Sequence, residues 1–313
     1  MTAKRYLPTF LLGLLSLLFV CAHAEAQSPF TFVSGAGSDA NPCTRALPCQ
    51  TLSRGASQVT IGGEVYVLDA LDEDAQFSQM YIFKSLSIIG AGARAGITGI
   101  LNIAPETGGQ VLLKGLDINA PGGNGIQVQT TGITLVVDDC TIKNGVNGIA
   151  FVPQGTGTSN LIVRNSIITK NVAGISTGSN AGIFIQPGSG AKAVAMIENV
   201  NVNNNNYGIR AYDNSTVTVR NSVSTENVWA GIRSEAVSGG PVAVFVEHSQ
   251  VSHNGGGGVV AVGATAVLRI TDVTITNNAT GVNYTTGGIV YSFGNNAIAG
   301  NASTLPPTPI PLS

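Results

Sequence analysis

The sequence contains few charged residues and almost no excess of either sign. Charged side chains make up 10% of the 313 residues, and 15 basic residues stand against 17 acidic ones, for a formal net charge of −2. Proteins that bind nucleic acid or anionic membranes through a general electrostatic field carry a clear basic excess. The composition therefore argues against both kinds of partner, and we predict no nucleic-acid binding.

Residue types that hold metals are also scarce. The chain has three histidines and four cysteines, and their spacing does not match a zinc motif. One acidic run contains Asp69, Asp72, Glu73 and Asp74, whose oxygens are of the type that calcium prefers. A solvated acidic loop is the simpler interpretation of this run. We therefore predict no metal centre and no cofactor.

A long apolar run occurs at the start of the chain. Lys4 and Arg5 precede an apolar stretch over 10–20, and small residues flank Glu25 at a candidate cleavage point. This pattern is typical of a secretory signal peptide, and the run is short for a membrane span. We predict that 1–26 are a signal peptide and that the protein is exported to the periplasm, the cell surface or the medium. We expect no transmembrane segment after it.

Export permits disulfide bonds. Cys43 and Cys49 lie close together in the segment NPCTRALPC, and we predict that they form a local disulfide. Cys140 is left over, at a position where the repeat described below predicts an inward-facing side chain. A small buried thiol is a simpler interpretation of Cys140 than a reactive one.

What the chain has in abundance is repetition. Seven segments share one pattern at irregular spacings of 22 to 34 residues, and their fourth residues alternate in charge until the last. This charge column consists of Lys114, Asp138, Arg164, Glu198, Arg220, Glu247 and Thr271. A recurring unit with loops of variable length is typical of a stacked solenoid. Neighbouring parallel strands lie about 4.8 Å apart, so the alternation places each charge between opposite partners.

Further columns follow the same repeat. Apolar residues alternate with the charge column at a period of two, which predicts strands with one buried face. One corner column contains Asp139, Asn165, Asn199, Asn221, His248 and Asp272. A second column is expected to stack its amides as a ladder and contains Asn144, Asn171, Asn205, Asn227, Asn254, Asn278 and Asn301. A glycine before an apolar residue then recurs at Gly125, Gly148, Gly174, Gly208, Gly231, Gly258 and Gly281, where a Cβ would obstruct the backbone or a neighbour.

These features together resemble the right-handed parallel β-helix of the pectin-lyase-like superfamily. They are the variable coils, the Asn column after an inward apolar residue, and an amphipathic segment at 49–60 with Leu52, Ala56 and Val59 at helical spacing. NPCTRALPCQTLSRGA and SFGNNAIAGN also look like segments of exported bacterial β-helix proteins of unassigned function. The resemblance implies an all-β fold, a right-handed parallel β-helix (β-solenoid) with a short N-terminal capping helix. We expect a lead-in with the disulfide loop at 27–48, the β-helix at 49–301 and a Pro-rich tail at 302–313.

Enzymes of this superfamily usually act on acidic polysaccharides, so the resemblance raises a lyase or a hydrolase as one function. Asp138-Asp139 and His253-Asn254-Gly255 are similar to fragments of polygalacturonase motifs, but several coils separate them and the companion motifs are missing. His248 and Asp272 share a corner column, and we interpret them as a ladder contact. The sequence therefore assigns no catalytic residue.

One surface cluster is not explained by stacking. Arg210 and Arg233 occupy the outward position two residues after the turn glycine, in a column with Ala150, Ser176, Val260 and Asn283. Arg suits carboxylate recognition, and aromatic faces suit sugar rings. We predict an acidic-glycan contact site with six members: Tyr207, Arg210, Tyr212, Trp229, Arg233 and Glu235. In the alternative interpretation, Glu235 pairs with Arg233 and neutralises the patch.

The preferred function is thus a secreted or cell-surface β-helix that binds carbohydrate or mediates surface interaction, with an acidic polysaccharide as the candidate partner. One alternative is a polysaccharide lyase or glycoside hydrolase that acts on acidic glycans. The other is a structural or adhesive solenoid without a small ligand. An acid–base cluster in a groove would favour the enzyme, and an aromatic and arginine strip would favour the binding protein.

Overall fold

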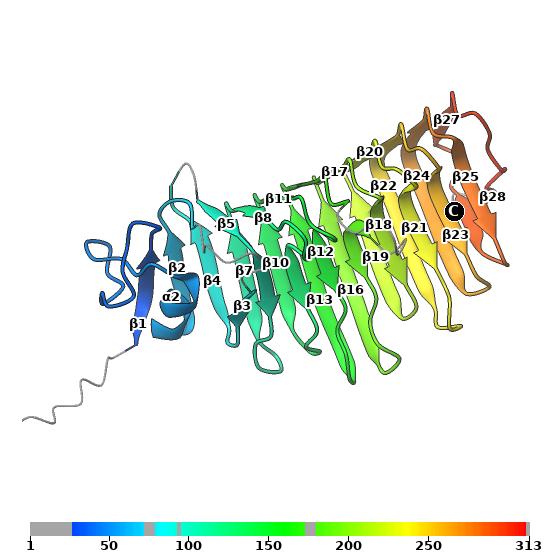
Figure 1. Cartoon of the computed structure of the whole chain (residues 1–313). Helices are drawn as coiled ribbons and strands as arrows, with labels where there is room; N and C mark the ends of the chain where they lie inside the picture. The colour runs from blue at the N-terminus through cyan, green and yellow to red at the C-terminus, as the bar shows by residue number, and fades with distance from the viewer. Residues whose placement is uncertain (1–26, 72–78, 93–94, 173–179, 311–313) are drawn as a thin grey trace, which may run out of the picture.

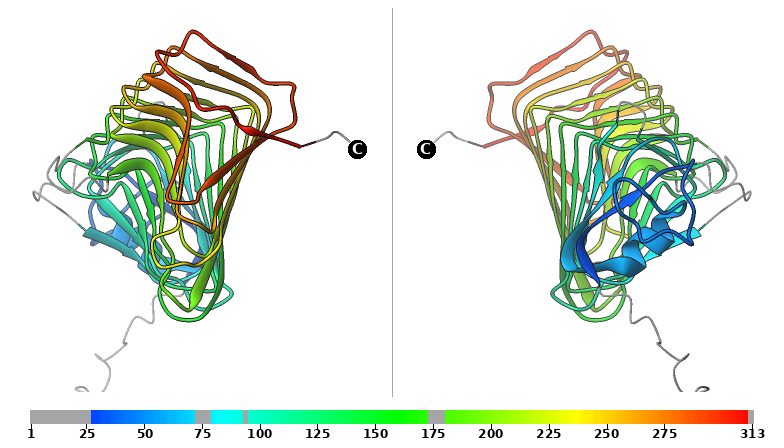
Figure 2. Two further views of the ribbon diagram at one scale, coloured as in Figure 1. Left: turned by 90° about the vertical axis from the view of Figure 1, so that its right-hand side faces the viewer. Right: turned by 90° about the vertical axis from the view of Figure 1, so that its left-hand side faces the viewer.

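The computed structural model describes residues 27–71, 79–92, 95–172 and 180–310, and these form one elongated stack of parallel β-coils (Figure 1). Views along the stack show the coils wound around a common interior (Figure 2). The predicted signal peptide lies outside the described residues. In the part of the chain that is described, no helix has the length and apolar character needed to cross a membrane.

Three faces make up each coil. We call the first face the long-strand sheet, and in stacking order it contains β1 (Ser28–Val33), β2 (Val59–Val67), β4 (Leu86–Gly90), β7 (Gln110–Lys114), β10 (Thr134–Asp138), β13 (Gly157–Arg164), β16 (Ala191–Glu198), β19 (Ser215–Arg220), β22 (Val242–Ser252), β24 (Ala266–Thr276), β26 (Ile289–Ser292) and β28 (Thr308–Pro309). A short second face contains β5 (Gly96–Thr98), β8 (Asp117–Asn119), β11 (Thr141–Lys143), β14 (Ile167–Thr169), β17 (Asn201–Asn203), β20 (Val223–Thr225), the ends of β22 and β24, and β27 (Ala297–Ala299). The third face is a separate nine-stranded sheet of β3 (Gln79–Ile82), β6 (Ile100–Ile103), β9 (Ile126–Val128), β12 (Ile149–Phe151), β15 (Ala181–Ile185), β18 (Tyr207–Tyr212), β21 (Ala230–Glu235), β23 (Gly257–Val262) and β25 (Thr280–Thr285).

The interior of the stack is filled by the predicted apolar columns. In the coil of β10, for example, Leu135, Val137 and Ile142 are each fully buried. Leu161 and Leu268 stand at the position of Leu135 in other coils and are equally enclosed. Since inward and outward residues alternate along each strand, the outward positions remain for charges and for contacts with other molecules.

The register of the paired strands confirms the charge column. Each member lies opposite the next across paired strands, from Lys114 beside Asp138 to Glu247 beside Thr271. Two ion pairs form along it, Arg164 Nη2 to Asp138 Oδ2 at 3.1 Å and Arg220 Nε to Glu198 Oε1 at 2.9 Å. Burial raises the pKa of Asp138, but hydrogen bonds from Asn165 and Arg164 and the positive charges of Arg164 and Lys114 outweigh it and hold the pKa below its usual value. The column therefore stabilises the stacking of successive coils.

Reversal of one charge in this column should destabilise the stack. In Glu198→Lys, three positive side chains stand in succession, because Arg164 and Arg220 flank position 198. Like charges on adjacent strands cost up to about 1 kcal/mol per pair, and exposure of Glu198 reduces this by screening. We expect a lower melting temperature at low salt and partial recovery at high salt. An unchanged melting temperature at low salt would contradict the assigned role of the column.

The first corner uses left-handed backbone geometry. Asn165, Asn199 and Asn221 have φ angles of 53°, 53° and 50°, and Asp139, His248 and Asp272 at the same place in other coils are also positive. Asn and Asp tolerate this region because their short polar side chains bond locally. Asn199 Nδ2 donates to Asn165 Oδ1 at 2.8 Å, so the column also connects neighbouring coils.

The buried Asn ladder is confirmed from Asn171 to Asn301. Each Oδ1 accepts from both the backbone N–H and the side-chain amide of the preceding Asn, as in the pairs 171–205, 205–227, 227–254, 254–278 and 278–301. The prediction was wrong for Asn144, which is exposed with a φ of 63°. Gly145 takes the ladder position instead, and its N–H donates to Asn171 Oδ1 at 2.9 Å. The adjacent Asn-Gly pair shifted the alignment by one residue.

The recurrent turn glycine is required by close approach. A Cβ on Gly231 would lie 2.5 Å from Val251 Cγ1, 2.8 Å from the ladder amide of Asn254 and 2.9 Å from the carbonyl oxygen of Gly258. Gly174, which we assigned to this column, lies outside the described residues. The equivalent residue of that coil is Gly182, because Ile183 pairs with Ile149 and Ile209. The error arose because this coil carries a longer insertion than its neighbours.

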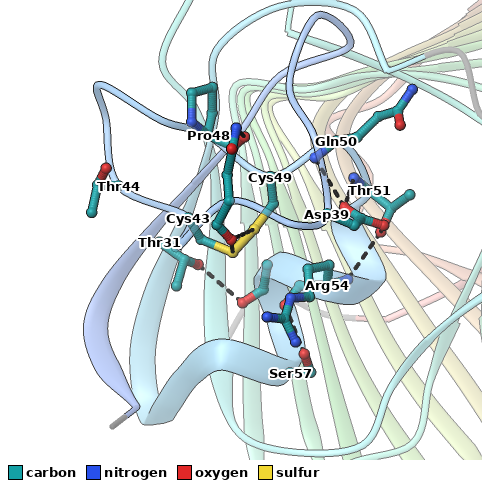
Figure 3. The surroundings of a disulfide bond; sticks show 12 residues. Thr31, Asp39, Cys43, Thr44, Pro48, Cys49, Gln50, Thr51, Arg54 and Ser57 are labelled. Carbon is teal, nitrogen blue, oxygen red and sulfur yellow. Dashed lines mark hydrogen bonds between the residues drawn. A yellow bond between two sulfur atoms is a disulfide. The ribbon is translucent and has the colours of Figure 1, made fainter. Parts of the chain in front are cut away.

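The N-terminal end of the stack is covered as expected. Helix α2 (Leu52–Gln58) buries Leu52 and Ala56. Cys43 and Cys49 form the predicted disulfide (Figure 3). Asp39 accepts hydrogen bonds from the N–H groups of Gln50 and Thr51 and so joins this loop to the start of the helix (Figure 3).

The long-strand sheet begins earlier than the predicted boundary at residue 49. β1, in the predicted lead-in, pairs in parallel with β2, and the ring of Phe32 stacks on that of Tyr66 with centroids 5.2 Å apart. At the other end β28, in the predicted tail, pairs with β26. Both short segments were missed because each lies beside the irregular chain that covers an end of the stack.

Candidate functional site

The predicted cluster lies on the outer surface of the nine-stranded sheet, on β18 and β21. Arg210 pairs in register with Arg233, and Tyr212 pairs with Glu235. The prediction that the two arginines are neighbours on adjacent coils is therefore confirmed. On the other side of β18, Phe184 of β15 stands opposite Arg210. We call Tyr207, Arg210, Tyr212, Arg233 and Glu235 the arginine cluster.

Glu235 binds both arginines and compensates one of their two charges. Its Oε2 accepts from Arg210 Nε at 3.0 Å and Nη2 at 2.9 Å, and from Arg233 Nε at 2.8 Å. Burial alone would raise the pKa of Glu235, but the hydrogen bond from Arg233 and the two positive charges outweigh burial and lower it. The alternative pairing with Glu235 holds, and it involves both arginines.

Aromatic rings enclose Arg210. Its guanidinium carbon lies 4.5 Å from the ring centroid of Tyr207 and 4.8 Å from that of Tyr212, both within cation–π range. Phe184 packs edge-on against Tyr212 with centroids 5.5 Å apart, and Ala181 and Val152 complete this apolar cover. Burial raises the pKa of Tyr212 to about 12, so its hydroxyl stays neutral. Arg210 is therefore fixed by these rings and by Glu235, and its role is structural.

Arg233 is the more accessible arginine. Its side chain is 23% exposed, compared with 8% for Arg210. Arg233 uses Nε toward Glu235, and no acceptor among the described residues takes a hydrogen bond from its Nη groups. The sum of two arginines and one glutamate leaves one net positive charge. The cluster therefore retains one guanidinium edge that can donate to a carboxylate.

Trp229 lies near the cluster in the chain but is not part of it. Tyr207 pairs with Ala230, so Trp229 stands one residue out of register with Tyr207. Its side chain is 55% exposed, and none of the cation–π or ion-pair contacts of the cluster within the described residues involves it. Trp229, predicted as a member of the site, is therefore outside these contacts, and its exposed ring can still contact a ligand.

Phe184 was not predicted as a neighbour of Arg210. The misalignment of the coil that contains Gly182 placed Ser176 in the outward column instead. Ser176 lies outside the described residues, and Phe184 stands in the column between Ala150 and Arg210. The signal was present in the sequence, since Gly182-Ile183 repeats the glycine and apolar pair of the other coils.

A second aromatic feature, also missed, lies near the N-terminal end of the same sheet. The rings of Tyr81 and Phe83 are nearly parallel, with an interplanar angle of 6° and centroids 5.5 Å apart, and Phe83 is 67% exposed. They border an open groove of about 540 Å³ beside α2. Lys84 forms part of this groove, and its Nζ donates to the carbonyl oxygens of Ser57 and Val59 at the end of the helix.

The candidate enzyme residues do not come together. Asp138 ends β10 and His253 follows β22, with β13, β16 and β19 between them in the sheet. His248 Nε2 lies 3.5 Å from Asp272 Oδ2, and both side chains are mostly exposed, as expected of a ladder contact. Among the described residues there is no group of three His, Cys, Asp or Glu side chains placed to hold a metal.

Two further predictions concern single residues. Cys140 is buried and is the one free cysteine of the described chain, and burial raises its pKa to about 11. This matches the predicted inert thiol.

Of the acidic run that we considered as calcium ligands, Asp69 accepts hydrogen bonds from Ser34 Oγ at 2.6 Å and from the Gly35 N–H at 2.7 Å, so it holds the chain that leads into the disulfide loop. Asp72, Glu73 and Asp74 lie outside the described residues.

Comparison with known proteins identifies the fold. No family model matches the chain, and no curated protein sequence matches it significantly. The crystal structure of pectate lyase Pel9A is similar over 92% of this chain and 80% of that chain, with a TM-score of 0.64 and 14% sequence identity. At this level of identity the likeness establishes architecture alone. Together with the parallel coils, it shows that the chain has a pectin-lyase-like right-handed parallel β-helix fold.

Proposed function

We propose that this protein is an exported β-helix that binds acidic polysaccharide through the outer surface of its nine-stranded sheet. The observation that carries the proposal is the partly exposed guanidinium of Arg233, whose Nε is bound to Glu235 and which lies over the ring of Tyr207. Pre-organisation of a guanidinium lowers the entropy lost when a carboxylate binds. Trp229, exposed on the same coil, offers a ring face to a sugar. The disulfide supports an oxidising compartment.

The paired rings of Tyr81 and Phe83 support a second contact on the same sheet. Both point outward from β3 and the residues after it, and sugar C–H faces pack well against flat aromatic surfaces. β3 and β21 are separated by β6, β9, β12, β15 and β18. A polysaccharide is long enough to use both places, whereas a single sugar is not.

Titration of uronate oligosaccharides tests the proposal. We expect Arg233→Gln to weaken binding at least about tenfold, because a hydrogen bond to a charged group contributes about 1.5–3 kcal/mol. Arg210 still pairs with Glu235 in this variant, so the fold should be retained. Lys143→Gln is a control on the short second face, where Lys143 pairs with Asp117 at 2.6 Å. Equal affinity of wild type and Arg233→Gln, or no binding by wild type, would contradict the proposal.

A polysaccharide lyase is the second candidate, and the fold likeness to pectate lyase Pel9A favours it. Lyase or hydrolase activity would release unsaturated or reducing ends from acidic polysaccharides. The same panel of oligosaccharides, incubated with the protein and assayed for both kinds of end, distinguishes binding from turnover. If wild type neither binds nor cleaves any member of the panel, a structural or adhesive role is the better account.

A further inference from the structure

The outer surface of the long-strand sheet carries a contiguous apolar stripe. One column of register partners on this surface contains the apolar residues Leu112, Val136, Ile162, Met196 and Phe245, with Thr218 between the last two. These side chains are half-buried, and Val194, on the same surface of β16, is 44% exposed. Single exposed apolar residues are ordinary, but a contiguous stripe marks an interaction surface.

The charge column beside the stripe has a symmetry of its own. Its six charged members alternate in sign from Lys114 to Glu247, with equal numbers of each sign. When such a column is reversed end to end, every position changes sign. A second copy turned around in this way therefore has the opposite charge at all six positions, of which Asp138 alone is buried at 10% exposure, whereas a copy in the same direction and register has like charges.

We propose that the protein forms a two-fold symmetric dimer through the long-strand sheet. The two-fold axis lies in the interface, along the strand direction, between β13 and β16. Arg164 of each copy then faces Glu198 of the other, and the two solenoids run in opposite directions. A two-fold interface is self-complementary by construction, which is the property that the reversed column has. Face-to-face sheets lie about 10 Å apart, a gap that long charged side chains span.

The apolar stripe fits the same axis. Ile162 faces Met196 of the other copy at the centre of the interface, and Leu112 faces Phe245 toward its ends. The arginines of the column remain available for such contacts, because Arg164 is 46% exposed and Arg220 40% exposed despite their ion pairs within the sheet. The centre of the interface is thus apolar and is bordered by charges, as in stable protein interfaces.

The extent of the sheet also agrees with this axis. β1, β2, β4, β7, β10 and β13 lie on one side of it, and β16, β19, β22, β24, β26 and β28 lie on the other. In this arrangement the two sheets therefore overlap along their whole length. At about 4.8 Å per strand and about 17 Å per strand length, each copy contributes roughly 1,000 Å². A standard stable interface buries about 800 Å² per partner.

The dimer leaves the nine-stranded sheet of each copy exposed, since that sheet forms a different face of the coil. The inference does not rest on the carbohydrate proposal. If both hold, the dimer presents two glycan-contact surfaces, and binding to a long polysaccharide becomes bivalent.

Sedimentation equilibrium of the whole protein tests the dimer. We expect wild type to be dimeric at micromolar concentration and Met196→Glu to raise the dissociation constant at least 100-fold, because each dimer contains the buried charge twice. Met196 points outward, so the circular dichroism spectrum should not change. Thr274→Glu is the control, since Thr274 is an exposed β24 residue on the short second face. A monomeric wild type, a larger oligomer, or a dimer unaffected by Met196→Glu would overturn the proposal.

Thiol crosslinking tests the orientation independently. In a Cys21→Ser background the remaining native cysteines are the bonded pair Cys43–Cys49 and the buried Cys140. We expect an equimolar mixture of Leu112→Cys and Phe245→Cys proteins to form a covalent heterodimer with a bifunctional thiol reagent that spans the gap of about 10 Å between facing sheets. A direct disulfide is too short for this gap. Neither variant alone should crosslink. Homodimers of each variant alone would show that the copies run in the same direction, and no crosslink in the mixture would show that another surface pairs; both results overturn the proposal.

Discussion

Asn227→Ala is expected to lower the free energy of unfolding by about 3–4 kcal/mol. Asn227 is buried, its Oδ1 accepts from the Asn205 N–H at 3.1 Å, and its Nδ2 donates to Asn254 Oδ1 at 2.9 Å. Nδ2 also donates to the carbonyl oxygen of Val202 at 3.3 Å. Truncation leaves several buried donors and acceptors unpaired, and each costs about 1–3 kcal/mol. Chemical denaturation, read as both midpoint and slope, measures the loss.

The matched control for this variant is Asn160→Ala. Asn160 is exposed in β13, and we expect its replacement to change stability by less than about 0.5 kcal/mol. Asn214 is a poorer control, because its φ of 60° adds backbone strain for alanine. Equal stability of the Asn227 and Asn160 variants would show that the ladder does not contribute to folding.

Glu235→Ala is expected to destabilise the protein by about 3 kcal/mol. The substitution leaves Arg210, whose side chain is 8% exposed, without its carboxylate partner beside Arg233. Removal of one member from a buried charge group costs about 3–5 kcal/mol, and the partial exposure of Arg233 places this case at the low end. The triple replacement Arg210→Met, Arg233→Leu, Glu235→Leu should recover much of the loss, because no unpaired charge remains. Both are measured by denaturant unfolding at neutral pH.

The same carboxylate gives stability a pH dependence. The folded-state pKa of Glu235 lies below its usual value, so its contribution is present above that usual value and is lost as the pH falls through the folded pKa. We expect acidification to destabilise wild type by a component that Glu235→Gln lacks. Parallel acid unfolding curves for the two proteins, or a Glu235→Ala variant as stable as wild type, would show that the cluster is not an energetic unit.

These expectations separate the two arginines by role. Arg210 is enclosed by aromatic rings and the Glu235 carboxylate, so its replacement should lower the stability of the fold. Arg233 is partly exposed, so its replacement should weaken ligand binding. The sequence placed both in one column and could not distinguish them, because the column position does not determine the direction that a long side chain takes.

Most of the architecture was predictable from periodicity. In a solenoid each coil contacts its neighbours in the stack, so a local repeat in the sequence states directly which residues will be adjacent in space. Register in a sheet with one buried face is strongly specified, because a slip of one residue would expose the whole apolar set. This is why the charge column and the ladder from Asn171 onward were found correctly.

The errors occurred where the repeat is interrupted. The insertion before β15 hid Gly182 and Phe184, and the Asn-Gly pair at 144–145 offered two residues for one ladder position. The strands β1 and β28 lie at the two ends of the stack, where the sequence does not show the repeat, so they were not recognised as strands. In each case the local pattern allowed more than one alignment, and contacts with neighbouring coils selected among them.

The sequence by itself therefore determined the coil, its inward columns and the order in which charges and amides stack, because these depend on neighbours at a repeating distance along the chain. The tertiary structure alone decided that Glu235 reaches both arginines, that Tyr207 and Tyr212 enclose one of them, and that Trp229 stands apart. Those outcomes depend on side-chain rotamers and on which surface each loop covers. A periodic pattern does not encode either property, because both are set by packing between residues that occupy different places in the repeat.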